Sequence, residues 1–236
     1  MSAYDELKIN AYQCNRELPR RGVVLYSFGN VSALDDSRGV VAIKPSGVAY
    51  EKLQPEDMVV VDLDGQVVEG RLKPSSDTRT HLVLYRHFPR IRGVAHTHSP
   101  YAVAWAQAAR PIPLLGTTHA DQTHSDIPCT DFLSAENIQA DYEEETGRQI
   151  VRTFAHLSPQ EVEMVLVAGH GPFTWGASPE QAVYHAVMLE ELAKIAWLTL
   201  QINPQAERLP ADLIQKHYQR KHGPHATYGQ SGSLSK

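Results

Sequence analysis

Two histidines separated by one residue, His96 and His98, are the first candidates for chemistry in this sequence. They lie in residues 93–99, an apolar segment that predicts a buried strand, and residues two apart on a strand face the same side. Both imidazoles would therefore enter one cavity, as a compact metal ion requires of two ligands. Alone, the pair is equally consistent with buried histidines satisfied by hydrogen bonds.

Two further residues could complete such a centre. His170 ends a second apolar segment, residues 164–168, and enters a Gly-Pro loop, and sites often form where a scaffold passes into a loop. Asp77 precedes a predicted helix over residues 78–88, where it could instead serve only as the helix N-cap. Three histidines and at most one carboxylate form a ligand set that suits zinc and leaves positions for substrate oxygens.

Three loops of small residues are candidates for binding a phosphate: Ser27–Asn30, Lys44–Gly47 and Lys73–Ser76. Each follows a β-like run and offers backbone N–H groups and hydroxyls, and two of them add a lysine. Such loops suit an anion, especially where a helix begins, as after Ser76. Any one of them would be interpreted as a tight turn, but three beside a metal motif favour a phosphate pocket.

Asp121 and Tyr228 are weaker candidates. Asp121 follows the apolar run 112–115, where it could be a surface turn residue or a general acid/base. Tyr228 lies near the end of the sequence, beyond the basic stretch 217–222. Its spacing alone indicates no more than a packing residue.

Composition narrows the class of protein. The 236 residues are 42% hydrophobic and 21% charged, which is typical of a soluble globular domain. The net charge of −5 argues against nucleic acid or an anionic membrane as the main partner. Two cysteines, Cys14 and Cys129, form no disulfide framework and suit a reducing compartment. With no signal peptide and no apolar run of membrane-spanning length, we expect a cytoplasmic protein. The 12 histidines favour metal chemistry.

The elements that would position these residues alternate between short strands and longer helices. Asp64-Gly65 predicts a hairpin turn, and Pro19 with Gly22 predicts the end of the first helix. We expect β-like runs at 23–26, 31–34, 40–43, 58–62, 67–69, 93–99 and 164–168, a loop at 170–173, and helices at about 7–18, 78–88, 101–109, 134–154, 178–202 and 211–222. This predicts an α/β fold with a mixed, mainly antiparallel sheet covered by helices on both faces. Residues 1–230 would form one domain and 231–236 a disordered tail.

Taken together, the segments resemble the L-ribulose-5-phosphate 4-epimerases of the class II aldolase family, including their paralogues in L-ascorbate utilisation. The resemblance runs in family order from about Asn15 to Gln230. It is carried by GNVSA, KPSGVAYE, DMVVVDLDGQVVEG, KPSSDTRTH, GVAHTHS, WAQA, IPLLGTTHAD, DIPCT, ETG, HGPFTWG, AVYHAVMLEELAK and KHYQRKHGPHATYGQ. It implies the three-layer class II aldolase fold and a phosphorylated ketopentose substrate.

The resemblance also implies roles for individual residues. One zinc ion per subunit would be bound by His96, His98 and His170, with Asp77 beside it as a further ligand. Asp121 and Tyr228 would be the acid/base pair, with Tyr228 supplied by a neighbouring subunit of a cyclic homotetramer. Glu143 and His217 match further residues near the active site. The substrate phosphate would lie among Gly29, Asn30, Lys44, Ser46, Gly47, Ser75 and Ser76.

Such an enzyme would break the bond between carbons 3 and 4 of the ketose and re-form it on the other face, retaining the aldehyde fragment by its phosphate. This sequence departs from the family pattern at residues 122–125, which reads Gln-Thr-His-Ser in place of an aromatic run and bears on substrate preference. Thr227 also replaces a tyrosine before Tyr228.

Two other functions remain open at this stage. A class II aldolase acting on a sugar such as L-fuculose 1-phosphate would share the fold and the metal. A non-catalytic scaffold like the adducin head domain is disfavoured by the complete histidine set together with Asp121 and Tyr228. The arabinose and ascorbate pathways use the same reaction, so the sequence does not separate them.

Overall fold

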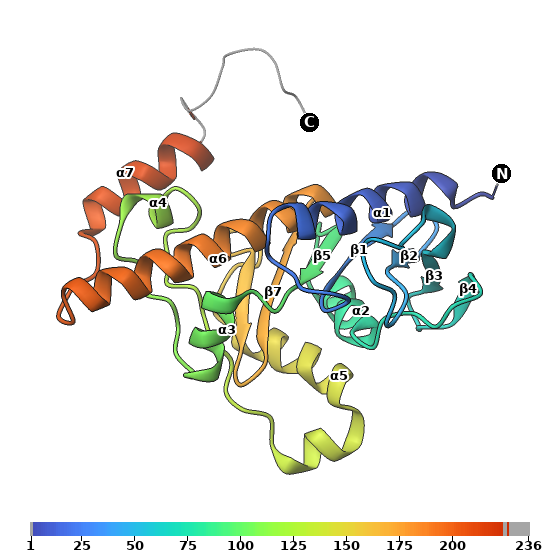
Figure 1. Ribbon diagram of the computed structural model, residues 1–236. Helices are drawn as coiled ribbons and strands as arrows, with labels where there is room; N and C mark the ends of the chain where they lie inside the picture. Colours follow the sequence, from blue (N-terminus) through green and yellow to red (C-terminus); the bar gives the residue numbers. More distant parts are fainter. Residues whose placement is uncertain (1, 224–225, 227–236) are drawn as a thin grey trace.

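The computed structural model describes residues 2–223 and 226, and within them a single seven-stranded sheet forms the centre of the molecule (Figure 1). Its strand order is β4-β3-β2-β1-β5-β7-β6, and the paired strands are all antiparallel. The strands are β1 (Asn30–Asp35), β2 (Val40–Ile43), β3 (Val59–Asp62), β4 (Val67–Glu69), β5 (Gly93–His96), β6 (Met164–Val167) and β7 (Gly171–Gly176).

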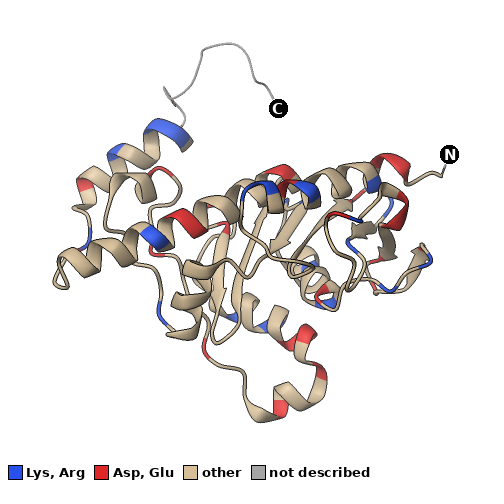
Figure 2. Ribbon diagram, viewed as in Figure 1, with Lys and Arg blue, Asp and Glu red and all other residues tan. Residues whose placement is uncertain are grey.

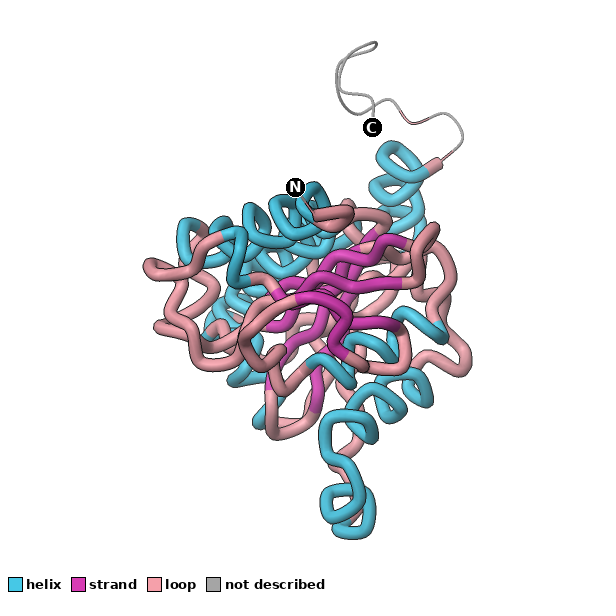
Figure 3. The backbone as a smooth tube through the Cα atoms, turned by 90° about the vertical axis from the view of Figure 1, so that its right-hand side faces the viewer, coloured by secondary structure: helices cyan, strands magenta, loops and turns pink. Residues whose placement is uncertain are grey.

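Helices cover both faces of this sheet, as the sequence predicts (Figure 3). One face is covered by α1 and α6 and the other by α2 and α5. The helices are α1 (Asp5–Arg20), α2 (Thr78–His87), α3 (Pro100–Gln107), α4 (Thr117–Ala120), α5 (Ala135–Thr153), α6 (Pro179–Ile202) and α7 (Ala211–His222), with a 3-10 turn, η1, at Pro55–Asp57. The predicted fold class is therefore confirmed.

Successive side chains along each strand point to opposite faces of the sheet, so the core forms two layers. In β1, Val31 packs toward α1 and α6, whereas Leu34 joins the aromatic core beneath α2 and α5. In β5, Ala95 belongs to the first layer and Val94 to the second. His96 follows Ala95, so it faces the same side as Val94, toward α2. Charged residues lie mainly on helices and loops, and β5, β6 and β7 carry no Lys, Arg, Asp or Glu (Figure 2).

Most predicted elements are confirmed, including the Asp64-Gly65 hairpin, where Asp62 N–H donates to Gln66 O at 2.9 Å and Gly65 has φ of 87°. Helix α1 runs one residue past Pro19. The prediction of a β-like run at 23–26 is wrong. Tyr26 has φ of 53°, and Phe28 N–H donates a hydrogen bond to Leu25 O, so these residues form a turn. That turn carries the following residues onto β1.

The loop expected at 170–173 is also wrong, since Gly171–Gly176 forms the strand β7 between β5 and β6. A proline normally disrupts a central strand because it lacks an N–H. Here Leu166, opposite Pro172, makes its backbone bonds outward to Pro128 and Thr130. Pro172 therefore occupies a position where β6 requires no donor.

None of the helices in the described residues is long and apolar enough to cross a membrane. The expected tail, 231–236, lies outside the described residues.

Candidate metal centre and phosphate-binding cavity

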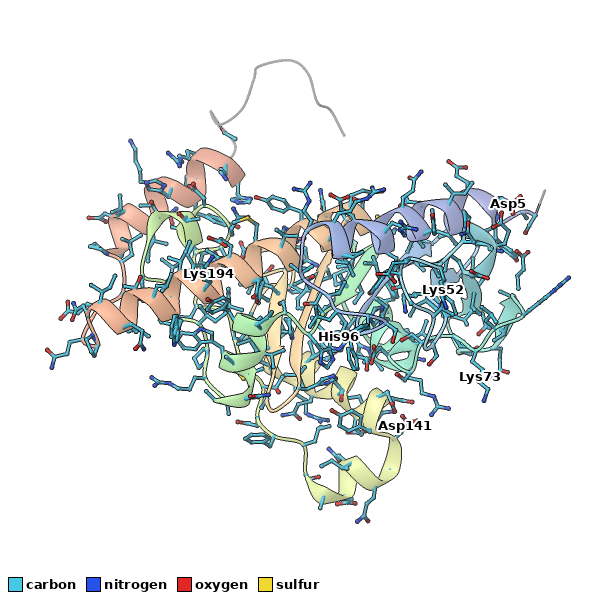
Figure 4. The ribbon with its side chains drawn as sticks, viewed as in Figure 1. Asp5, Lys52, Lys73, His96, Asp141 and Lys194 are labelled. Atoms are coloured by element: carbon cyan, nitrogen blue, oxygen red, sulfur yellow. The ribbon has the colours of Figure 1, made fainter. Side chains whose placement is uncertain are left out.

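Three histidines converge where β5 ends and β7 begins, and Figure 4 labels the first of them, His96. His96 is the last residue of β5, His98 follows it, and His170 precedes β7. One potential ligand atom from each lies within 4.8 Å of the others, and the Nε2 atoms of His96 and His98 are 3.0 Å apart. His96 donates its Nδ1–H to Pro172 O at 2.9 Å, which leaves Nε2 unprotonated in the neutral ring. The three residues therefore fit a metal ion.

Burial favours neutral imidazoles at His98 and His170. Burial, together with His96 and His98, lowers the pKa of His170 to about 3. Burial and His96 likewise lower the pKa of His98. A neutral imidazole keeps the lone pair that a metal ligand needs, so these histidines are ready to bind a cation at neutral pH.

Asp77 stands at the N-terminus of α2, but its side chain makes no capping hydrogen bond. Instead it accepts a hydrogen bond from Asn30 Nδ2 at 2.6 Å and lines the same cavity as the histidines. Burial opposes ionisation of this carboxyl, yet His96, His81 and the Asn30 hydrogen bond outweigh it and lower the pKa of Asp77. The structure thus favours a charged site residue over the helix cap that the sequence left open.

The three small-residue loops meet around this cluster. Ser46 N–H donates to Lys73 O at 2.9 Å and Ser75 N–H donates to Lys44 O at 3.0 Å, which joins the second and third loops by their backbones. The first loop is held by Tyr50, whose hydroxyl donates to Gly29 O at 2.8 Å. Loops far apart in the sequence therefore form one wall.

Together the loops and histidines enclose a cavity of about 310 Å³. Its lining comprises Ser27, Phe28, Gly29, Asn30, Lys44, Pro45, Ser46, Gly47, Ser75, Ser76, Asp77, His96, His98, Tyr142, Glu143 and His170. All residues predicted to hold the phosphate or the metal thus line one space. Lys73 is exposed and does not belong to this lining.

Gly29 allows the first loop to approach the metal cluster closely. It has φ of 78°, and a Cβ there would lie 2.6 Å from His96 O. Both facts exclude a larger residue without a backbone shift. Beneath the loops, buried Lys44 donates to Ser27 O at 3.2 Å. Burial lowers the pKa of Lys44 to about 8, so a nearby anion would favour its charged form.

Tyr142 and Glu143 are cavity residues that come from α5. The sequence predicts a continuous helix over 134–154, which hides a kink at Asp141 with φ of −150° and ψ of 92°. The kink turns Tyr142 toward the cavity, with its hydroxyl 3.3 Å from His170 Nδ1. Glu143 came only from the resemblance and Tyr142 from no signal, because the kink depends on contacts with α2.

Asp121 is not brought into this cavity. It follows α4 and binds α7, where His217 Nδ1 donates to its Oδ1 at 3.0 Å and Arg220 Nη2 donates to its Oδ2 at 2.8 Å. Burial opposes its ionisation, but the hydrogen bonds from Arg220 and His217 lower the pKa of Asp121. Tyr228 lies outside the described residues.

The protein-family model of the class II aldolase and adducin N-terminal domain matches residues 10–197 of this chain. The chain belongs to the class II aldolase family. Its fold, with one antiparallel sheet between helices, is the fold of solved members of this family.

Several solved structures are similar to this chain over most of its length. An L-fuculose 1-phosphate aldolase has a TM-score of 0.80 and 23% sequence identity, over 93% of this chain and 97% of its own. YgbL from Klebsiella pneumoniae, a candidate aldolase/epimerase/decarboxylase, has a TM-score of 0.72 and 27% identity, over 92% and 99%. The L-fuculose-1-phosphate aldolase from Thermus thermophilus has a TM-score of 0.63 and 24% identity, over 86% and 98%.

Proposed function

We propose that this protein is a zinc-dependent epimerase that interconverts L-ribulose 5-phosphate and D-xylulose 5-phosphate. The observation that carries the proposal is the convergence of three histidines and three phosphate-type loops in one cavity of about 310 Å³. Membership of the class II aldolase family and the epimerase-like motifs support it. A zinc ion bound by His96, His98 and His170, with Asp77 beside it, would supply Lewis acidity toward the ketose oxygens.

The chemistry explains why the cavity combines these two parts. The hydrogen on carbon 4 of a 2-ketose is not alpha to the carbonyl, so simple deprotonation does not invert that carbon. Instead, a base takes the proton of the carbon-4 hydroxyl, the bond between carbons 3 and 4 breaks, and its electron pair passes to the carbonyl system of the ketose fragment. Carbon 4 becomes the aldehyde of glycolaldehyde phosphate.

The aldehyde then turns over, the ketose fragment attacks its opposite face, and a second group returns a proton to the new alkoxide. The phosphate loops retain the aldehyde while it turns. Ser46, Ser75 and Ser76 offer hydroxyls to the phosphate, and Lys44 adds positive charge beneath them. Without this anchor the fragment would leave, and the reaction would end as an aldol cleavage.

Asp121 and Tyr228 would be the two proton-transfer groups. Because Asp121 is held against α7 and is absent from its own chain's cavity lining, we infer that it acts in the cavity of a neighbouring subunit. Helix α7 leads directly toward Tyr228 in the sequence, so both groups would come from the same neighbour. The active assembly would be the homotetramer that the resemblance implies.

The test is incubation of the purified protein with L-ribulose 5-phosphate. We expect D-xylulose 5-phosphate to form without free glycolaldehyde phosphate. The second candidate is an aldolase of the L-fuculose-1-phosphate type, which the likeness to two such aldolases favours. That activity would instead release two fragments from L-fuculose 1-phosphate and leave the pentose phosphate unchanged.

A further inference from the structure

Tyr142 lies at the metal centre although no sequence motif marks it. Its hydroxyl is 3.3 Å from His170 Nδ1, and its ring centre is 6.0 Å from that of His170. The residue is 37% exposed, so it forms part of the cavity wall and not of the core. A tyrosine on the exposed side of a helix needs no partner, and its contact with a metal-site histidine therefore calls for a function.

The backbone around Tyr142 is fixed from two sides. At the kink before it, Asp141 forms an ion pair with Arg79 and accepts a hydrogen bond from Glu144 N at 3.1 Å. After it, Glu143 O accepts a hydrogen bond from Thr80 Oγ1 at 2.6 Å. Asp141 thus caps the second part of α5 and holds it against α2, below the site (Figure 4).

A histidine that binds a metal through one nitrogen normally donates the other N–H to a protein acceptor, which fixes the tautomer and the ring. His96 follows this pattern, with its Nδ1–H directed to Pro172 O. For His170, the atom placed beside Nδ1 is the hydroxyl oxygen of Tyr142. A phenol oxygen can accept such a hydrogen bond.

We propose that Tyr142 is a positioning residue of the metal centre, whose hydroxyl accepts the Nδ1–H of His170 and so presents His170 Nε2 to the metal. The proposal rests on the zinc site of the proposed function. It adds that the third ligand is oriented by a side chain from α5, whereas the first is oriented by the backbone of β7. The kink at Asp141 is then the feature that places this side chain.

The test compares Tyr142→Phe with wild type and with Tyr184→Phe, a matched control at an exposed tyrosine of α6. Zinc affinity is measured by competition with a chelator, and the cobalt-substituted proteins are compared by visible absorption. Loss of such an outer hydrogen bond typically weakens metal affinity about 10–100-fold. We expect Tyr142→Phe to show this weaker zinc affinity and a changed cobalt spectrum. Tyr184→Phe should have the zinc affinity and the cobalt spectrum of the wild type.

Unchanged affinity and an unchanged cobalt spectrum in Tyr142→Phe would overturn the proposal while leaving the zinc enzyme intact. A wild-type protein that binds zinc but does not epimerise would refute the proposed activity without affecting this inference, and one that binds no zinc would refute both. If metal-free Tyr142→Phe melts at a lower temperature than metal-free wild type, the zinc affinity of a second variant, Thr80→Val, decides between a positioning role and a loss of stability. It releases the tie to Glu143 without altering the tyrosine, so weaker zinc binding supports the proposal and unchanged binding overturns it.

Discussion

Asp121 and His217 are joined by a hydrogen bond of 3.0 Å between two parts of the chain that the sequence separates by 96 residues. This contact binds α4 to α7, and it keeps the Asp121 carboxylate on the helix that precedes Tyr228. The structure therefore places Asp121 with α7, apart from the histidines of the same chain, and Tyr228 follows α7 in the sequence.

This separation predicts a pattern of complementation between inactive variants. Asp121→Asn retains an intact metal cavity, and His98→Asn retains an intact Asp121 and Tyr228. Asp121→Asn should lose roughly 10²–10⁴-fold in turnover if Asp121 is a general acid/base, and His98→Asn should lose activity because it loses a metal ligand. Hybrid oligomers of the two should recover activity, because some sites then combine a sound cavity with a sound neighbour. The measurement is turnover after dissociation, mixing and reassembly.

The control for that experiment is a mixture of Asp121→Asn with Tyr228→Phe. If both groups come from the same neighbour, no site in this mixture has an intact pair, and activity should stay at the level of the parents. Recovery here, with none in the first mixture, would show that Asp121 and Tyr228 act from different subunits.

A second prediction concerns the phosphate loops. Ser76→Ala should raise the Michaelis constant for the phosphorylated ketose by about tenfold or more, since hydrogen bonds to charged groups contribute roughly 1.5–3 kcal/mol. The affinity for an unphosphorylated analogue should change little. Ser37→Ala, at an exposed turn beyond β1, serves as the matched control. An equal effect on both ligands would show that the loop only supports the fold.

Metal content is the third prediction. Wild type should contain one zinc ion per subunit, and the double variant His96→Asn/His98→Asn should contain almost none. His156→Asn, at an exposed histidine after α5, should behave as wild type. Elemental analysis of the purified proteins makes the comparison. If the double variant still contained one zinc ion per subunit, the histidine cluster would not be the zinc site.

The fourth prediction uses a partly buried pair away from the cavity, Glu163 and His185, whose side chains are 26% and 12% exposed. His185 donates its Nδ1–H to Trp175 O at 2.7 Å, and its Nε2 lies 3.3 Å from Glu163 Oε2. Burial raises the pKa of Glu163 from 4.5 to about 7, and burial lowers the pKa of His185. Below about pH 7 the folded protein therefore favours a protonated Glu163 carboxyl beside a neutral His185.

Because folded Glu163 holds its proton more tightly than the unfolded chain does, unfolding releases a proton between about pH 4.5 and 7. This contribution to stability is present at low pH and is lost as the pH rises through that window. Glu163→Gln should flatten the decline and raise the free energy of unfolding at pH 8 by roughly 1–2 kcal/mol. Urea unfolding at pH 5 and pH 8 checks this, with exposed Glu161→Gln as control. Parallel pH profiles for wild type and Glu163→Gln would contradict it.

The sequence predicts the fold class and the cavity wall because both follow from local signals. Alternating apolar residues and turn chemistry define the strands, and His96 and His98 share a face through strand geometry alone. Each small-residue loop follows a β-like run, and the sheet brings the three loops to one place. These features depend on short-range rules, which a single sequence carries.

The parts that escape sequence reasoning depend on tertiary contacts. The kink at Asp141 needs Arg79 on another helix, so neither the kink nor the place of Tyr142 is visible in the local pattern. Strand β7 tolerates Pro172 only because Leu166 bonds elsewhere. The position of Asp121 follows from α7, about a hundred residues later in the chain.

In the proposed reaction, the cavity retains the phosphorylated fragment while the carbon–carbon bond is broken and re-formed. This retention is tested most directly by incubating the zinc-loaded protein with L-ribulose 5-phosphate and following both D-xylulose 5-phosphate and free glycolaldehyde phosphate over time. We expect D-xylulose 5-phosphate to accumulate to equilibrium while glycolaldehyde phosphate stays undetected. Steady release of glycolaldehyde phosphate, or no conversion by a protein that contains one zinc per subunit, would contradict it.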